Sequence, residues 1–158
     1  MQKLFLAVTL CAACTGSAFQ PAAATAATDS AAASLALVAR HAEVADVVVT
    51  SIEGKPMHGQ LVLKPLLRGE QMTMLELHYQ PGAKAPLHTH THESLIYVVS
   101  GHVKTWIGDE VYILGPGDVA RHPAGVLHTV EALVESTIVE VKSPAPDIAN
   151  FIVTGRHP

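Results

Sequence analysis

Three histidines are the residues of this sequence whose types and spacing best fit a chemical role. His88 and His90 stand two apart in the run Leu-His-Thr-His-Thr-His-Glu, and His128 follows 40 residues after His88. Side chains two apart on an extended strand point to the same face, so His88 and His90 can act together. A third imidazole from a distant strand would complete a three-nitrogen cage. Imidazole binds zinc, iron, copper and nickel alike, so the pattern predicts a divalent metal without selecting one.

Short apolar and β-branched runs, broken by turn residues, follow one another from Val47 onward. Runs of this length with Gly and Pro between them are typical of the strands of an all-β barrel or sandwich. Small barrels can hold one ligand or metal in their interior, which suits the expected histidine cage. We expect eight strands, over residues 47–52, 60–67, 72–79, 94–100, 102–107, 111–114, 127–134 and 137–141.

Length and composition limit the classes of protein. The chain has 158 residues, 49% of them apolar and 15% charged, which is typical of one globular domain. Its net charge is −4 at pH 7 and it has no basic cluster, so we expect no nucleic-acid partner. We divide the chain into a signal peptide at 1–18, a linker at 19–46 with a short helix at 31–45, a barrel at 47–143 and a C-terminal tail at 144–158.

The first 18 residues have the pattern of a cleaved signal peptide. Lys3 provides a positive charge, an apolar stretch covers 4–13, and Gly16 and Ala18 are the small residues expected before a cleavage site after Ala18. The apolar stretch is too short to span a bilayer. We therefore expect an exported protein, periplasmic or secreted, with no transmembrane span in its mature form.

The two cysteines offer an alternative for processing. Cys14 follows two alanines, so a lipoprotein signal could end at residue 13 and leave a lipid anchor on Cys14 in the membrane. Cys11 is the other cysteine, and cleavage after Ala18 removes both. The mature barrel would then have no thiolate ligand, and a metal site in it must use nitrogen and oxygen.

The histidines lie in two motifs that resemble the motifs of the cupin superfamily. The first is Gly82, five residues, His88-x-His90 and Gly101 further on; the second is Gly117, five residues, Pro123-x-Gly125-x-x-His128. The resemblance implies a single cupin-type jelly-roll β-barrel that binds one divalent transition metal (iron, manganese, nickel, copper or zinc) through His88, His90 and His128. It also implies a small-molecule ligand or substrate and a homodimer, in which an exposed strand over 47–52 could pair across subunits.

The fourth ligand of the resemblance is not matched. Where the family has a Glu or Gln, seven residues before Gly101, this chain has Ser94, and Glu93 stands one position earlier. A shift of one residue turns a side chain to the opposite face of a strand. Three arrangements remain open: a β-bulge that swings Glu93 inward, a three-histidine site with water or substrate in the other positions, or ligation by His92.

The resemblance implies an exported mononuclear metalloenzyme that acts on a small oxygenated organic molecule. Superfamily members with three histidines and no carboxylate ligand include iron dioxygenases, so a dioxygenase is favoured over an isomerase or a lyase. Open coordination positions are typical of catalytic sites. The alternative is a non-catalytic periplasmic module that binds a small molecule or a metal, in which His92 or Glu93 would close the coordination shell.

Five further polar residues have expected positions. Glu76 and His78 lie two apart on an expected strand, and with both facing the interior Glu76 would be a catalytic general base. Ser94, in the vacant ligand position, would face the site and hydrogen-bond a metal-bound water. His102 and His122 lie at turns, so we expect them at the surface.

Overall fold

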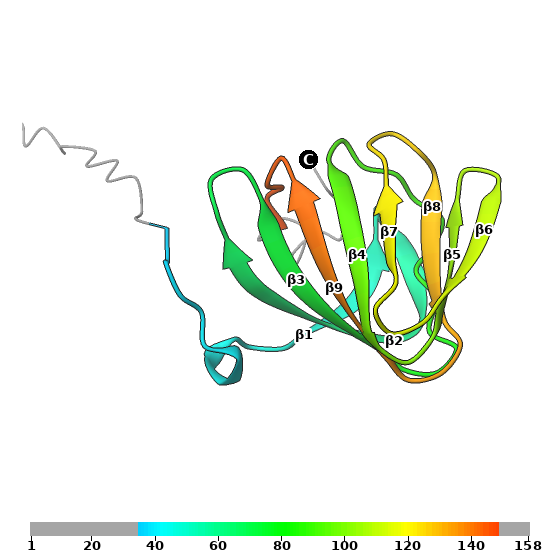
Figure 1. Cartoon of the computed structure of the whole chain (residues 1–158), viewed down its shortest axis with the longest axis horizontal. Coiled ribbons are helices and arrows are strands. Elements are labelled where there is room, and N and C mark those ends of the chain that lie inside the picture. The colour runs from blue at the N-terminus through cyan, green and yellow to red at the C-terminus, as the bar shows by residue number, and fades with distance from the viewer. Residues whose placement is uncertain (1–34, 149–158) are drawn as a thin grey trace, which may run out of the picture. The chain divides into compact units, whose positions relative to one another are not determined.

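The computed structural model of the protein describes residues 35–148. The predicted signal peptide, the alternative lipidation position and residues 149–158 lie outside the described residues. The elements that lie wholly within the described part are strands and one 3-10 helix, drawn in Figure 1. The elements are η1 (His41–Glu43), β1 (Val47–Ile52), β2 (Lys55–Arg68), β3 (Thr73–Tyr79), β4 (Glu93–Ser100), β5 (Val103–Ile107), β6 (Glu110–Leu114), β7 (Val119–His122), β8 (His128–Ala132) and β9 (Ser136–Ser143).

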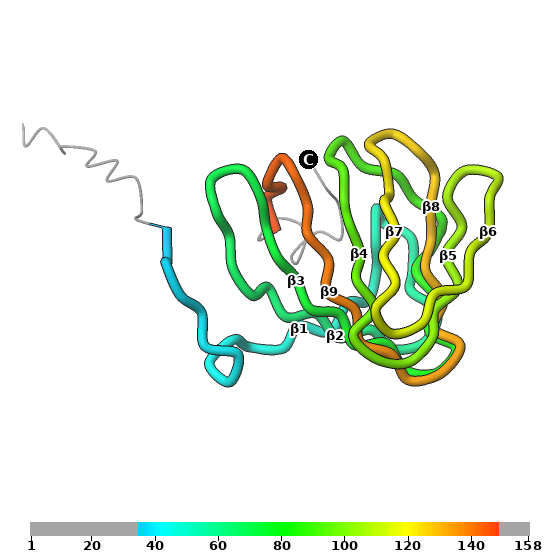
Figure 2. The backbone as a smooth tube through the Cα atoms, viewed as in Figure 1, coloured from blue at the N-terminus to red at the C-terminus, as the bar shows by residue number. Residues whose placement is uncertain are grey.

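The strands form two antiparallel sheets. Six strands pair in the order β1-β2-β3-β9-β4-β7, and three pair in the order β6-β5-β8. β9 is the last strand in the sequence, yet it runs between β3 and β4, as the backbone trace in Figure 2 shows. The predicted all-β class is confirmed. From β4 onward the chain passes several times between the two sheets, because β5, β6 and β8 belong to the smaller sheet and β4, β7 and β9 to the larger one, as in a jelly-roll barrel.

Alternate residues of the strands point into the space between the sheets. In β3, Leu75 and Leu77 are buried while their neighbours face outward. The apolar core includes Ile138 of the larger sheet and Val103 and Val130 of the smaller one. Burial of each such side chain contributes about 1.5–3 kcal/mol, so this core fixes the sheets and the loop ends that carry polar residues.

One strand was not predicted from the sequence. β7 has four residues between the turn at 115–118 and Pro123, which is too short for an alternating pattern to show. It pairs with β4, where His122 lies opposite Ser94. This pairing matters for the site because it carries His122 into the interior.

The helix predicted at 31–45 is not found in its described part. Residues 35–45 contain only the three-residue η1, none of whose side chains is buried. A short helix without a packed face is marginal in water, which explains the difference. Over residues 35–148, no helix has the length and apolar character needed to cross a membrane.

Candidate metal centre

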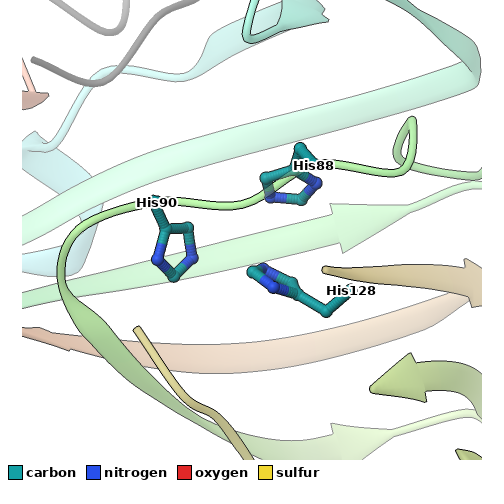
Figure 3. Close-up of side chains that lie close together, drawn as sticks. All are labelled: His88, His90 and His128. Atoms are coloured by element: carbon teal, nitrogen blue, oxygen red, sulfur yellow. The ribbon is translucent and has the colours of Figure 1, made fainter. Parts of the chain in front are cut away.

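Two distant segments bring three histidines together. His88 and His90 lie in the loop before β4, and His128 is the first residue of β8. His88 and His128 form an antiparallel bridge with two backbone hydrogen bonds of 2.9 and 3.1 Å. One ring nitrogen of each of the three residues lies within 4.8 Å of the others, and Figure 3 shows the rings facing a common space. The structure thus assembles the predicted triad.

The ring orientation of each histidine is fixed by its backbone surroundings. Nδ1 of His88 donates to the Pro86 carbonyl at 2.8 Å, Nδ1 of His90 to the His92 carbonyl at 2.7 Å, and Nδ1 of His128 to the Val126 carbonyl at 2.9 Å. A carbonyl can only accept, so each Nδ1 carries the hydrogen. In a neutral ring Nε2 then carries the lone pair, and metal-binding histidines are held in this way.

Burial keeps these rings neutral. Loss of solvation lowers the pKa of His88 to about 3, and the nearby His128 and Lys142 lower it further in the same direction. Loss of solvation likewise lowers the pKa of His90 to about 3 and lowers that of His128. Three neutral imidazoles with inward lone pairs are a donor set that suits a divalent transition metal. The described residues therefore fit the metal that the sequence predicts.

These pKa shifts predict acid sensitivity of the metal-free protein. A histidine in the unfolded chain titrates near its ordinary pKa of about 6.5, whereas His88, His90 and His122 titrate at about 3 in the fold. Between these values the unfolded state binds more protons, so the free energy of unfolding should fall as the pH is lowered from about 6.5 to about 3. Urea denaturation at about pH 7, 5.5 and 4 measures this. A free energy that stays constant over this range would contradict the assignment.

The structure does not bring Glu93 to the histidines. The β4–β9 pairing is regular from Glu93 to Val98, and its register shift lies beyond that, so no bulge turns Glu93 inward. Its carboxylate accepts a hydrogen bond from Arg121 at 3.1 Å, and its side chain is 45% exposed. Glu93 therefore occupies the outer face of β4, as a one-residue shift requires.

Ser94 faces the interior in the position where the resemblance calls for a carboxylate. Its exposed fraction is 0%, and it lies opposite His122 on β7 and Lys142 on β9. The Ser94 side chain is also one of the groups that lower the pKa of the Glu140 carboxyl. A water-positioning role for Ser94 stays a prediction, but its side chain points to the interior as expected.

Glu76 faces the opposite side of the sheet from the expected one. Leu75 and Leu77 fill the interior positions of β3, so Glu76 and His78 lie on its outer face. Glu76 Oε1 lies 2.7 Å from Nε2 of both His78 and His41, and these hydrogen bonds lower its pKa against the effect of burial. The structure therefore holds Glu76 in an outer cluster and does not place it at the triad.

Two further histidines pack against the triad. His92 is buried, and its ring stacks on His90 with 3.8 Å between centroids, but it is not a member of the group within 4.8 Å. The prediction of a surface position for His122 was wrong. Its exposed fraction is 2%, and its ring stacks on His128 at 4.3 Å. Because the Thr105 hydroxyl donates to a carbonyl, it accepts the hydrogen of His122 Nε2 at 3.0 Å.

An interior cavity of about 50 Å³ adjoins the triad. Apolar side chains form most of its wall, which is typical of small-molecule sites with a few convergent polar groups. Those polar groups are His88, His122, His128, Glu140 and Lys142. The sequence pattern does not single out Glu140 and Lys142, because their strand also carries valines at the alternate positions.

Known proteins resemble this chain in sequence and in fold. The model of the cupin domain matches residues 75–141. An RmlC-like cupin from Shewanella frigidimarina aligns with a TM-score of 0.61 and 18% identity, covering 72% of this chain and 96% of that one. A predicted oxalate decarboxylase from Thermotoga maritima aligns with a TM-score of 0.61 and 18% identity, covering 68% of this chain and 99% of that one. KdgF from a Halomonas species aligns with a TM-score of 0.55 and 25% identity, covering 56% of this chain and 83% of that one. No protein of curated function matches the sequence.

Proposed function

Because the chain belongs to the cupin superfamily and its barrel holds three neutral imidazoles beside an interior cavity, we propose that it is a mononuclear metalloenzyme acting on a small oxygenated organic molecule. The observation that carries the proposal is the set of Nδ1–carbonyl hydrogen bonds, which directs three Nε2 lone pairs to one space. A divalent metal held there by His88, His90 and His128 would polarise a substrate oxygen and lower the pKa of a bound water.

The arrangement supports catalysis better than sequestration. A sequestering module needs a closed coordination shell, which the sequence allows through Glu93 or His92. In the described part of the chain Glu93 is turned outward, and the group within 4.8 Å consists of the three histidines. Three protein ligands leave coordination positions for water or substrate, as in catalytic sites. Among reaction classes we favour a dioxygenase, because the donor set is three histidines without a carboxylate.

The first test is the metal content of the protein, purified without a nickel column, and of a Glu93→Ala variant. We expect near-stoichiometric metal in both, because the Glu93 carboxylate pairs with Arg121 and lies outside the triad. Elemental analysis by mass spectrometry measures this. If Glu93→Ala emptied the site, a four-ligand site with Glu93 would replace the three-histidine one. A wild-type protein that takes up no metal even after reconstitution would contradict the proposed function.

We also propose a homodimer formed through β1. β1 is an edge strand that pairs with β2 in the larger sheet, and Val48 on it is 59% exposed. Charged residues on edge strands block pairing between chains. Light scattering should give twice the monomer mass for wild type and the monomer mass for Val48→Lys. The matched control is Val111→Lys on the edge strand β6 of the other sheet, which should stay dimeric. A monomeric wild type would refute the dimer.

A further inference from the structure

β9 points a lysine and a glutamate into the barrel. Glu140 is 8% exposed and Lys142 is 5% exposed, and Lys142 Nζ donates to Glu140 Oε1 at 2.7 Å. Within residues 35–148, this is the hydrogen bond that the ammonium group makes. An ammonium group has three N–H donors, so two of them remain for a ligand.

Stability does not account for this pair. Removing two charges from water costs several kcal/mol for each ion, and apolar residues of similar volume in their place are often neutral or stabilising. The same strand carries Val139 and Val141 at the alternate positions, on its outer face. The chain thus places charge inside and valine outside, against the usual partition of a half-buried strand. Such an inversion indicates a functional role for the inward pair.

The pair shares one cavity with the proposed metal centre. Glu140 and Lys142 line the cavity wall together with His88 and His128. With three neutral histidines and a lysine and glutamate that cancel, the charge of a bound divalent metal would be unbalanced. An anion is the ligand that this charge distribution favours.

The cavity size limits that anion. One water-sized group needs about 10–15 Å³ of such volume, so about 50 Å³ accommodates about three to five groups. This excludes large ring systems from the interior and admits a two-carbon hydroxy acid such as glycolate, which has about five non-hydrogen atoms. We propose that Lys142 and Glu140 form the subsite for the part of the substrate that does not contact the metal, and that the substrate is a small hydroxy acid.

In this arrangement the substrate carboxylate accepts hydrogen bonds from Lys142, and a substrate hydroxyl donates to Glu140. The ammonium group cannot accept and the ionised carboxylate cannot donate, so the pair distinguishes the two ends of the ligand. Lys142 also keeps Glu140 ionised, because its charge and hydrogen bond hold the pKa of that carboxyl well below its usual range. This assignment rests on the proposed function for its metal, but the anion subsite can be tested separately.

The test is calorimetric titration of the full-length protein with glycolate, in metal-free form and after loading with Co²⁺. Glycolamide, a neutral analogue of similar size, is titrated in parallel. The variant is Glu140→Leu/Lys142→Met, in which both charges are removed so that neither is left buried alone. Its matched control is Glu131→Leu/Lys84→Met, which removes the surface pair whose ions lie 3.1 Å apart. Circular dichroism and cobalt content establish that each protein is folded and loaded.

We expect wild type and the surface control to bind glycolate at least about tenfold more tightly than glycolamide, and the interior variant to lose about 10- to 100-fold in glycolate affinity at unchanged cobalt content. Equal glycolate affinity in the folded, cobalt-loaded interior variant would overturn the subsite, as would a wild type that binds neither ligand. If wild type took up no cobalt but bound glycolate through Lys142, the metalloenzyme proposal would fail while the anion subsite stood.

Discussion

A His128→Ala variant is expected to lose most of its bound metal, with a fall in metal affinity of at least about 100-fold. Removal of a mere hydrogen-bond partner of a metal ligand costs about 10- to 100-fold, and His128 would itself be a ligand. It is also the central ring of the site, with centroids 4.4 Å from His88 and 4.6 Å from His90. The two remaining histidines cannot form a closed set of three donors. Competition with a chelator gives the affinity, and elemental analysis gives the content.

The control for this prediction is His102→Ala. His102 is an exposed histidine next to the Gly101 turn, so its removal changes the histidine count without touching the site. The control should keep full metal content and the wild-type thermal midpoint. Full metal retention in His128→Ala would refute the proposed cage. Equal loss in both variants would mean that metal binds to scattered surface histidines instead.

Local signals made the triad predictable. His88 and His90 are two residues apart, and their direction depends only on the local backbone. His128 follows Gly125, whose positive φ of 74° permits the turn that leads into β8. Gly125 N–H also donates to the His90 carbonyl at 2.9 Å, so the same turn ties the two motifs together. Residue spacing therefore carried nearly all the information that this part of the site needs.

The rest of the site depends on register, which the sequence does not specify here. In β4 both faces carry apolar residues: Ile96 and Val98 point inward, while Leu95 and Tyr97 are about half exposed on the outer face. With no polar face to orient the strand, nothing in the sequence decides between Glu93 and Ser94. The pairing with β9 decides it, because it places Ser94 opposite Lys142. Ser94 and Lys142 are far apart in the sequence, so their pairing cannot be deduced from a local pattern.

β9 shows the same ambiguity in a stronger form. A reading by hydrophobicity would turn Val139 and Val141 inward and Glu140 and Lys142 outward. The structure has the reverse, and the carboxylate that lines the cavity is Glu140 of β9, not Glu93 or Glu76. The same register explains His122, whose strand is short and whose burial follows from its partner Ser94. The misplaced residues are thus those whose position depends on pairing between distant strands.

A Lys142→Met variant is expected to lower the free energy of unfolding by about 3–5 kcal/mol, because it leaves the Glu140 carboxylate buried without its partner. The double change Glu140→Leu/Lys142→Met should restore the free energy of unfolding to within about 1 kcal/mol of wild type or exceed it, because no charge then has to be desolvated. Urea denaturation of the metal-free proteins at pH 7 measures both.

The surface pair again provides the comparison. Lys84→Met should cost no more than about 1 kcal/mol, because its ion pair with Glu131 is partly exposed and screened by solvent. If Lys142→Met were as mild as Lys84→Met, the interior pair would be hydrated and its charges would need no functional explanation. If the double variant were as unstable as the single one, the pair would be needed for folding. A large single effect and a small double effect would mean that the barrel retains these charges at a cost in stability, as expected of residues that bind a ligand.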